Sequence, residues 1–416
     1  MASSKRILII GGGTFGLSTA YHLAKSGYSD ITVLDKSEFL PSEDSAGNDV
    51  NKIIRAEYED PFYADLALDA IRQWQQNPLF APYYHQVGYL LGNSPAAPEK
   101  AKKTLAKSLA SISQHPAWAG QITPLNTRDD IRAVAPEFDG PMQWRGYFNK
   151  LAGYAHSGDA QHATYAACCE LGVKFGLGDA VSRLAWDADR CVGAHTASGR
   201  LYGADMVVVT LGASVARLVP SIAPQVTAKA WSVGHVQLTP GEAAKLRGIP
   251  VTYARDLGFF FEPDRRTHLL KMCPSGAGIT NYAGGQVSLP PGDSSYIPPH
   301  DEEAMRRMLR ETLPALADRP FVHKKMCWVA DTRDSDYVID FVPGKKGVIV
   351  VTGDSGHGFK MLPVAGKWVK TVIEDGKQTE ARWRWKEVSG GGEEDISWRV
   401  GNLYDLGQGA AISSKL

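Results

Sequence analysis

The chain has 416 residues, and its 45 Lys plus Arg balance its 45 Asp plus Glu, so the formal net charge is zero. This balance argues against a nucleic-acid partner, and the lack of any apolar run of about 18 residues argues against a membrane-spanning helix. The length predicts a large core divided between two lobes. The 5 cysteines lack the spacing of metal ligands and fit a reducing compartment better than a disulfide framework.

Residues 5–35 form the first ordered stretch and predict a dinucleotide-binding site. Ile7 to Ile10 is a short apolar run rich in β-branched residues, which favours a buried parallel strand. A G-x-G-x-x-G motif follows, then a helical pattern that ends at Gly27 and a second strand over Ile31 to Leu34. The alternative is a glycine-rich turn of another α/β fold.

Four residues of this stretch have expected roles. Gly11 permits the tight turn, Gly13 lets the backbone approach a pyrophosphate, and Gly16 lets the helix pack closely on the strand. The helix N-terminus offers free N–H groups and the positive end of its dipole to the phosphates. Asp35, after the second strand, is expected to accept hydrogen bonds from the ribose hydroxyls.

A polar loop over residues 41–49 precedes two cations, Lys52 and Arg55. In a flavin-type Rossmann lobe this loop crosses the flavin, so both cations are expected to point toward the flavin or a bound anion. The alternative is that both are solvated surface cations, which is the usual position of Lys and Arg.

The remaining chain predicts helices, parallel strands and, over residues 228–323, an antiparallel pattern. A hairpin-like segment is expected at 180–202, and the tail after Gly376 is expected to be irregular, with a flexible link at 390–392. Helices are expected at about 61–78, 97–114, 159–171, 301–313 and 364–374, and strands at 89–91, 173–175, 205–213, 232–238, 258–262, 268–272 and 347–351.

The last three residues, Ser414-Lys415-Leu416, form the S-K-L signal that a peroxisomal import receptor reads at a free C-terminus. The preceding residues 407–413 are small and polar, as expected of an exposed tail, although a tripeptide can also occur by chance. The N-terminus runs directly into the first strand, so no signal peptide is expected. These features predict a peroxisomal protein.

Six motifs together resemble the sarcosine oxidase and fructosyl amino acid oxidase (amadoriase) family of FAD enzymes. The resemblance spans nearly the whole chain. It is carried by G-G-G-T-F-G with Asp35, S-A-G-N-D-V-N-K at 45–52, N-P-L-F-x-P-Y-Y-H at 77–85, G-F-F-F-E-P-D at 258–264, M-C-W-x-A-D-T at 326–332 and G-x-S-G-H-G-F-K at 353–360.

The resemblance implies an α/β fold of two lobes, in which a Rossmann-type FAD-binding domain is interleaved with an antiparallel-sheet substrate domain. The expected FAD-binding domain comprises 1–60, 150–225 and 324–380, and the expected substrate domain comprises 61–149 and 226–323. Residues 381–416 are expected to form a C-terminal tail, and the protein is expected to be a monomer.

The resemblance also implies roles for particular residues. Cys327 holds the position of a cysteine that links the flavin by a thioether; the alternative is a buried core cysteine. Lys271 falls where the family keeps a lysine that activates oxygen; the alternative is a solvent-facing strand residue. Lys360 aligns with a lysine that holds the substrate carboxylate, and Arg55 falls on the position of a second such cation.

The expected catalytic residues are Lys271, Arg55, Lys360 and Lys52. The expected cofactor-binding residues are Gly11, Gly13, Thr14, Phe15, Gly16, Asp35, Lys36, Ser45, Asn51, Lys52, Cys327, Gly356, Gly358, Phe359 and Lys360.

The two branches of the family differ at substrate-contact positions. Fructosyl oxidases generally lack an arginine at the position of Arg55 and use a C-terminal arginine, which Arg399 matches weakly. They also carry an acidic residue just after the oxygen-site lysine, whereas residues 273–276 here contain no carboxylate, nor the histidine of sarcosine oxidase. His357 is expected either near the flavin or as a packing group.

The implied reaction is the FAD-dependent oxidation of the secondary amine of an N-methyl or N-alkyl amino acid. The implied partners are a small-molecule amine and O2, and the products are an imine and hydrogen peroxide. The imine could be hydrolysed or captured internally, and the reaction could belong to biosynthesis. The alternatives are a fructosyl amino acid oxidase and a flavin-binding dehydrogenase without oxidase activity.

Overall fold

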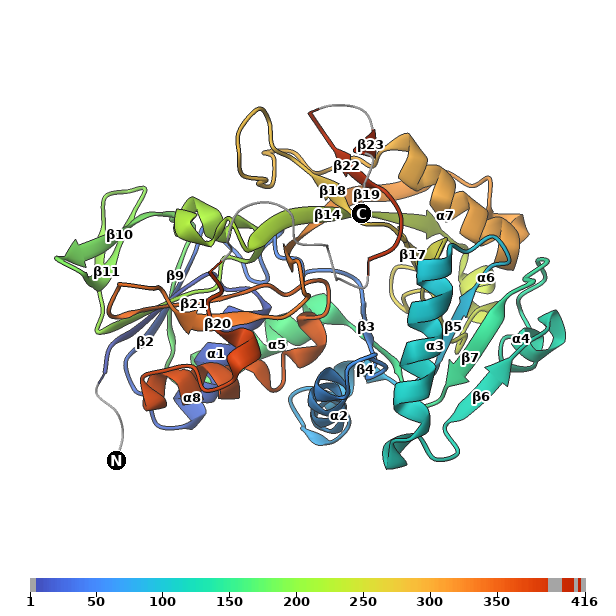
Figure 1. The fold of residues 1–416 in the computed structure, drawn as a ribbon, viewed down its shortest axis with the longest axis horizontal. Coiled ribbons are helices and arrows are strands. Elements are labelled where there is room, and N and C mark those ends of the chain that lie inside the picture. Colours follow the sequence, from blue (N-terminus) through green and yellow to red (C-terminus); the bar gives the residue numbers. More distant parts are fainter. Residues whose placement is uncertain (1–4, 388–398, 408–410, 413–416) are drawn as a thin grey trace.

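The computed structural model describes residues 5–387, 399–407 and 411–412. Figure 1 shows two lobes side by side, with the long strands β14 (Val226–Gln237) and β19 (Phe321–Thr332) crossing from one to the other. None of the described helices is long and apolar enough to span a membrane.

The first lobe is built on a six-stranded sheet of the order β20-β21-β13-β1-β2-β9. All its neighbouring strands are parallel except the edge strand β20, which is antiparallel to β21. The helices that pack beside this sheet are α1 (Thr14–Lys25), α5 (Ser157–Glu170) and α8 (Ala365–Asp375). The strands are β1 (Ile7–Ile10), β2 (Ile31–Asp35), β9 (Lys174–Leu177), β13 (Met206–Val209), β20 (Val338–Phe341) and β21 (Val348–Thr352). The expected Rossmann-type lobe is thereby confirmed.

The turn between β1 and α1 explains its glycines. Gly11 has φ of +107°, in a region that favours glycine. A Cβ on Gly16 would lie 1.9 Å from the backbone oxygen of Gly11, so only glycine allows α1 to start this close to β1. The predicted strand, turn, helix and second strand therefore occur where the sequence pattern places them.

The second lobe contains a large, mainly antiparallel sheet of the order β23-β22-β18-β14-β17-β16-β15-β5-β7-β6, to which β19 adds by pairing with β14. Two neighbouring pairs in it, β15 with β5 and β18 with β22, are parallel. Its strands are β5 (Tyr89–Asn93), β6 (Ile122–Leu125), β7 (Arg145–Asn149), β14, β15 (Val251–Ala254), β16 (Gly258–Phe260), β17 (Leu269–Pro274), β18 (Ile279–Thr280), β19, β22 (Leu403–Asp405) and β23 (Ala411–Ile412).

The remaining elements surround these two sheets. A small sheet, β3-β8-β4, and a meander, β10-β11-β12, complete the strands. The small-sheet strands are β3 (Lys52–Ile54), β4 (Tyr84–His85) and β8 (Gly153–Ala155), and the meander strands are β10 (Val181–Asp187), β11 (Arg190–Thr196) and β12 (Leu201–Gly203). The other α-helices are α2 (Pro61–Gln76), α3 (Glu99–Ser113), α4 (Arg128–Val134), α6 (Pro240–Lys245) and α7 (Pro299–Thr312). Short 3-10 helices occur at Ala81–Tyr83, Pro116–Trp118, Gly212–Arg217, Pro220–Ile222, Pro314–Leu316, Phe359–Met361 and Ala381–Trp383.

Two features differ from expectation. The boundary expected between residues 323 and 324 falls inside β19, which continues along β14 as one strand; the division into domains itself stays a prediction. The tail after Gly376 was expected to be irregular. This expectation is wrong for β22, whose backbone pairs with β18 of the large sheet. The expected link at 390–392 and the Ser414-Lys415-Leu416 signal lie outside the described residues.

Candidate active site

The start of α1 presents an open anion site. Gly13 is the N-cap residue, and no side chain caps the helix there. A Cβ on Gly13 would contact only Ser45 Oγ, at 3.4 Å, so space remains above the first turn. The Asp35 carboxylate accepts hydrogen bonds from Gly12 N at 2.8 Å and Ser37 N at 2.9 Å, which fixes it at the end of β2. Free N–H groups with a fixed carboxylate nearby fit a dinucleotide.

Two buried amides near this turn lack partners. Asn51 is fully buried, and neither its Oδ1 nor its Nδ2 has a hydrogen-bond partner among the described residues. Gln161 Nε2, from α5, is likewise buried without one. Because buried polar groups are almost always hydrogen-bonded, these atoms indicate a polar ligand here. The residues present therefore fit FAD.

The other expected cofactor-binding residues lie around the same turn, with one exception. Phe15 packs edge-on against Tyr337, with ring centroids 5.6 Å apart, and a Cβ on Gly358 would lie 3.2 Å from the Phe15 ring. Thr14 starts α1, Gly356 has φ of +72°, and Phe359 is buried. Lys36 is the exception, because it is exposed and forms an ion pair with Asp44.

A buried acid gathers three of the lysines in the structure. Asp49 Oδ2 lies 2.7 Å from Lys271 Nζ and 3.2 Å from Lys52 Nζ, and Asp49 Oδ1 lies 4.0 Å from Lys325 Nζ. Burial by itself would raise the pKa of Asp49, but the three lysines lower it below its ordinary value. Lys271 is 1% exposed, so the alternative of a solvent-facing lysine is wrong.

Lys271 is held by more than this ion pair. Its Nζ also donates to the backbone oxygen of Asn51 at 2.6 Å and lies 5.0 Å from the ring centre of Phe261. Burial lowers the pKa of Lys271, whereas Asp49 opposes the shift. Lys271 is thus a fixed side chain in a low-dielectric site, where an ammonium group suits stabilisation of negative charge that develops on a small molecule.

Cys327 lies on β19 and faces this lysine group. Its Sγ is 3.6 Å from Lys52 Nζ and 3.7 Å from the backbone oxygen of Ala46, and its side chain is half-buried. Lys52 itself is half-buried; burial would lower its pKa, but Cys327 and Asp49 raise it above the ordinary value. A thiol beside a cation suits chemistry that passes through a thiolate.

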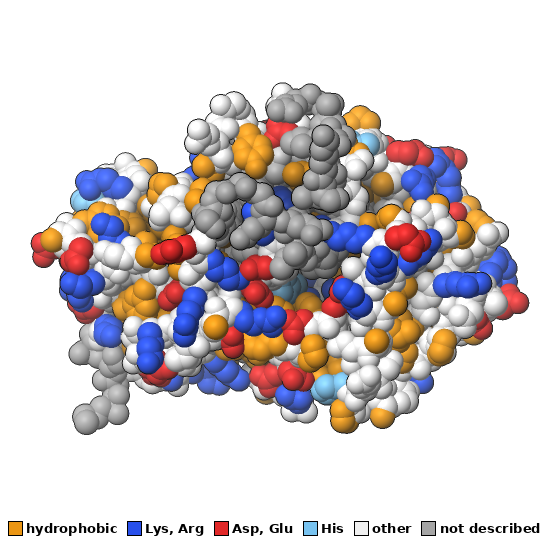
Figure 2. Space-filling model, viewed as in Figure 1, with side chains coloured by type: hydrophobic (Ala, Val, Ile, Leu, Met, Phe, Trp, Pro, Cys, Tyr) orange, Lys and Arg blue, Asp and Glu red, His pale blue; other side chains and the backbone are white. Residues whose placement is uncertain are grey.

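A second group of cations surrounds the ring of Tyr58. Lys360 Nζ donates to Tyr58 OH at 2.8 Å and lies 5.2 Å from the ring centre, while Arg55 Cζ lies 5.0 Å from the same centre. Arg55 donates to the backbone oxygen of Glu57. Burial and Arg55 lower the pKa of Lys360 well below its ordinary value, although Glu57 opposes the shift. Figure 2 shows other Lys and Arg side chains spread over the surface of this face, interspersed with Asp and Glu.

His357 supports the tyrosine ring and is not free to act as a base. Its Nε2 lies 2.9 Å from the backbone oxygen of Ser335, and its Nδ1 lies 3.2 Å from the hydroxyls of both Tyr58 and Tyr337. Burial and the nearby Lys360 lower its pKa well below the ordinary value. His357 is therefore neutral, with Nε2 donating and Nδ1 accepting, and it positions Tyr58.

Arg399 reaches the lobe interface from the tail. It is buried, forms an ion pair with Asp331 and lies 4.1 Å from the ring centre of Trp231. Asp331 also pairs with Lys229 at 2.8 Å. Trp231 is the cross-strand partner of Cys327, so Arg399 lies on the Cys327 face of the large sheet.

Several site residues were missed by the sequence interpretation. Asp49 lies inside the motif at 45–52. Its position between two expected flavin contacts, Ser45 and Asn51, could have identified it as a site residue. Buried Glu57 accepts from Asn149 Nδ2 at 2.6 Å, and the buried hydroxyls of Tyr89 and Tyr147 have no partner among the described residues. These tyrosines come from the second lobe, and nothing local in the sequence brings them to Arg55.

The comparisons with known proteins agree with this geometry. The sequence profile described as "FAD dependent oxidoreductase" matches residues 6–371. The chain is 33% identical to L-saccharopine oxidase of Schizosaccharomyces pombe, over 97% of this chain and 98% of that protein, and 24% identical to peroxisomal sarcosine oxidase of Mus musculus, over 86% and 90%. Among solved structures, fructosamine oxidase of Aspergillus fumigatus (Amadoriase II) superposes with a TM-score of 0.88 at 32% identity, covering 98% of this chain and 97% of that one. The chain therefore belongs to the family of FAD-dependent oxidoreductases.

Proposed function

We propose that this flavoprotein oxidises the secondary amine of an N-substituted amino acid and passes the electrons to dioxygen. The observation that carries the proposal is the pair of cations, Arg55 and Lys360, at the Tyr58 ring. Relatives named for saccharopine, sarcosine and N-methyl-L-tryptophan support the same substrate class.

The two cations bind and orient the substrate. Arg55 offers a planar fork to the substrate carboxylate, and Lys360 offers a point charge. Because both lie in a poorly solvated site, the carboxylate fixes the amino acid in one orientation. The same positive charge lowers the pKa of the substrate's amine, so the amine loses its proton on binding and its lone pair becomes available.

FAD, when bound, would supply two-electron chemistry: a hydride equivalent would leave the carbon next to the amine nitrogen, the nitrogen would lose its proton to give an imine, and dioxygen would take up two electrons and two protons to give hydrogen peroxide. The role of Lys271 is to stabilise negative charge as oxygen is reduced, and the role of Asp49 is to hold Lys271 in place. Asn51 is positioned to hydrogen-bond the cofactor.

Finer features belong to the same proposal. Cys327 holds FAD through a thioether, supported by its half-buried sulfur beside Lys52. The protein acts as a monomer and reaches peroxisomes through Ser414-Lys415-Leu416, where the peroxide is disposed of. Domain boundaries follow the division given above, with β19 contributing to both lobes.

A fructosyl amino acid oxidase is the second candidate. The similarity to Amadoriase II supports it. Against it, no carboxylate follows Lys271 within residues 273–276, and an arginine occupies position 55.

Peroxide release from a substrate panel tests the proposal. The panel comprises sarcosine, N-methyl aromatic amino acids, pipecolate, saccharopine and fructosyl-lysine. We expect the N-alkyl amino acids to exceed fructosyl-lysine in kcat/KM. Preference for fructosyl-lysine would support the second candidate, and NAD reduction without peroxide would support a dehydrogenase.

A further inference from the structure

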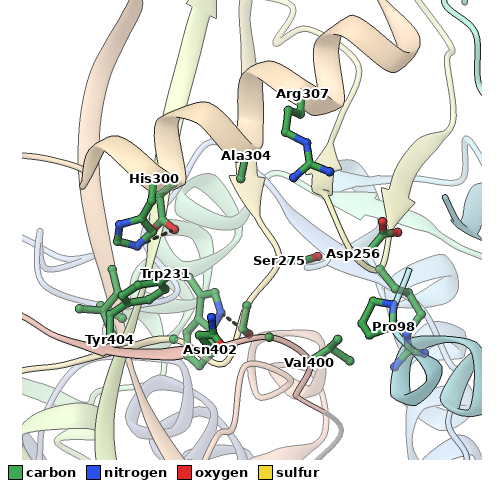
Figure 3. Close-up of a pocket in the computed structure, with 17 residues that line it drawn as sticks. Pro98, Trp231, Asp256, Ser275, His300, Ala304, Arg307, Val400, Asn402 and Tyr404 are labelled. Carbon is green, nitrogen blue, oxygen red and sulfur yellow. Dashed lines mark hydrogen bonds and ion pairs between the residues drawn. The ribbon is translucent and has the colours of Figure 1, made fainter. Parts of the chain in front are cut away.

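A cavity of about 320 Å³ lies in the second lobe, beside the tail segment 400–404. Its walls come from the end of β17, from α7, from the turn after β15 and from the tail. Figure 3 shows Arg307 pointing from α7 toward the space, with Val400 and Asn402 of the tail below it and Asp256 at one side. The cavity is the size of a small-ligand site and is lined by charged and aromatic side chains.

Arg255 lines this cavity and is an unpaired buried cation. Its side chain is 8% exposed, and its Nε is buried without a hydrogen-bond partner. No described side chain forms an ion pair with its guanidinium. Burial raises the pKa of Glu59 and the charge of Arg255 opposes this shift, but the two groups are too far apart to form an ion pair. A charge buried without a partner is costly, so Arg255 favours binding of an anion that no described side chain supplies.

The acids that line the cavity are already engaged. Asp256 accepts hydrogen bonds from Ser94 N at 3.0 Å and Ser94 Oγ at 2.5 Å. Asp301 accepts from Ser232 Oγ at 2.5 Å and lies 3.4 Å from His300 Nε2. Among the described residues, neither acid forms an ion pair with Arg255.

Strand β17 leads from the candidate active site to this cavity. Lys271 and Cys273 share one face of this strand, near Asp49, and Ser275, two residues further along the chain, lines the cavity. Four residues of extended strand span roughly 13 Å from Lys271 to Ser275. Trp231, the cross-strand neighbour of Cys327, lines it as well.

We infer that this cavity receives the far end of the substrate's N-substituent, and that Arg255 binds a carboxylate there. The inference rests on the proposed function and narrows it: the substrate is an N-substituted amino acid whose substituent is extended and ends in an acid group. A short substrate such as sarcosine reaches only the Arg55 and Lys360 end and leaves Arg255 without its anion.

The test compares matched acids and amides in two series. One series contains N-alkyl amino acids whose chain ends in a carboxylate or in its amide, measured as kcat/KM. The other replaces the amine nitrogen by an ether oxygen, which prevents oxidation, and is measured as Kd by calorimetry. We expect the wild-type protein to favour the acid by about 10- to 100-fold in both series.

Substitution of Arg255 identifies the residue responsible. R255Q is expected to lose the preference for the acid, and R255K to retain part of it. The exposed R183Q, on β10 in the meander, is the matched control and is expected to keep the full preference. Because R255Q removes an unpaired buried charge, its ligand-free unfolding midpoint should be no lower than that of the wild type.

The outcomes separate the two hypotheses. Oxidation of the amines without any preference for the acid, or a preference that survives in R255Q, overturns the inference and leaves the proposed function intact. Ether acids that bind through Arg255 while no amine is oxidised overturn the proposed function and leave only the carboxylate site at Arg255 supported. Absence of both preference and oxidation overturns both.

Discussion

The ammonium of Lys271 lies 2.7 Å from the carboxylate of Asp49, and these side chains are only 1% and 2% exposed. The acid is in the loop after β2, and the lysine is on β17 of the large sheet. Their contact therefore joins the nucleotide-binding end of the first lobe to the large sheet. The Asp49 carboxylate also opposes the lowering of the Lys271 pKa that burial causes.

Asp49→Asn is expected to lower the free energy of unfolding by about 3–5 kcal/mol, because it leaves a buried ammonium without its counter-ion. Chemical denaturation of the purified variant measures this. Asp30→Asn is the control, since Asp30 pairs with Lys174 on the surface at 3.0 Å and should cost at most about 1 kcal/mol. Equal losses in the two variants would contradict a stabilising role for the buried pair.

Lys271→Met is expected to slow oxygen reduction by about 100-fold or more while substrate oxidation stays near the wild-type rate, because the ammonium acts on charge that develops on oxygen. Stopped-flow spectroscopy separates the steps: anaerobic mixing with substrate follows one, and mixing of the reduced protein with oxygen follows the other. The exposed Lys174→Met controls for loss of a positive charge. An unchanged oxygen rate would remove Lys271 from this role.

Binding of a simple carboxylate, such as propionate, is expected to weaken as pH rises through the pKa of Lys360. Burial and Arg55 lower that pKa, so the free protein gives up the Lys360 proton at lower pH than an ordinary lysine does. A bound carboxylate favours the protonated form, so binding takes up a proton. Calorimetry in buffers of different ionisation enthalpy measures this uptake.

Lys360→Arg is the matched variant for the pH experiment. Arginine stays charged throughout the accessible pH range, so its carboxylate affinity should be nearly independent of pH where that of the wild type declines. If both proteins show the same pH dependence, another group is the one that titrates.

Cys327→Ser is expected to release the flavin on acid denaturation, whereas the wild-type protein should precipitate yellow. Cys273→Ser is the control, because Cys273 also lies near Lys271 and Lys52 but is buried on β17. Absorbance of pellet and supernatant gives the result. Free flavin from the wild type, or retention in Cys327→Ser, would contradict the thioether.

Local patterns predicted much of the fold. The helix expected over 61–78 is observed at Pro61–Gln76, because Asp60 caps its start by accepting from Phe62 N at 3.0 Å. The strands before and after α1, β1 and β2, could be predicted as well, because each is a short apolar run and the glycine motif follows β1 directly in the sequence.

Distant pairings explain what the sequence did not reveal. β19 and β22 gain strand structure from β14 and β18, which lie far away along the chain. The partner of Lys271 is likewise on a different lobe, so its burial and its counter-ion could not be inferred from alternation alone. The unpaired Arg255 follows a strand and resembles any surface arginine until the cavity beside it is seen.

A final pair of variants separates folding from cofactor binding at the α1 turn. Gly16→Ala would bring its Cβ to 1.9 Å from Gly11 O, so α1 must move off β1, and we expect lower stability and loss of FAD. Gly13→Ala meets only Ser45 Oγ at 3.4 Å, so this variant should fold with nearly normal stability.

Gly13→Ala should nevertheless retain much less flavin, because its methyl group occupies the space that the pyrophosphate needs. Flavin content and the unfolding midpoint of the flavin-free protein measure the two effects independently. A Gly13→Ala variant with full flavin content would show that the phosphates do not approach this turn, and the cofactor would then have to bind elsewhere along the sheet edge.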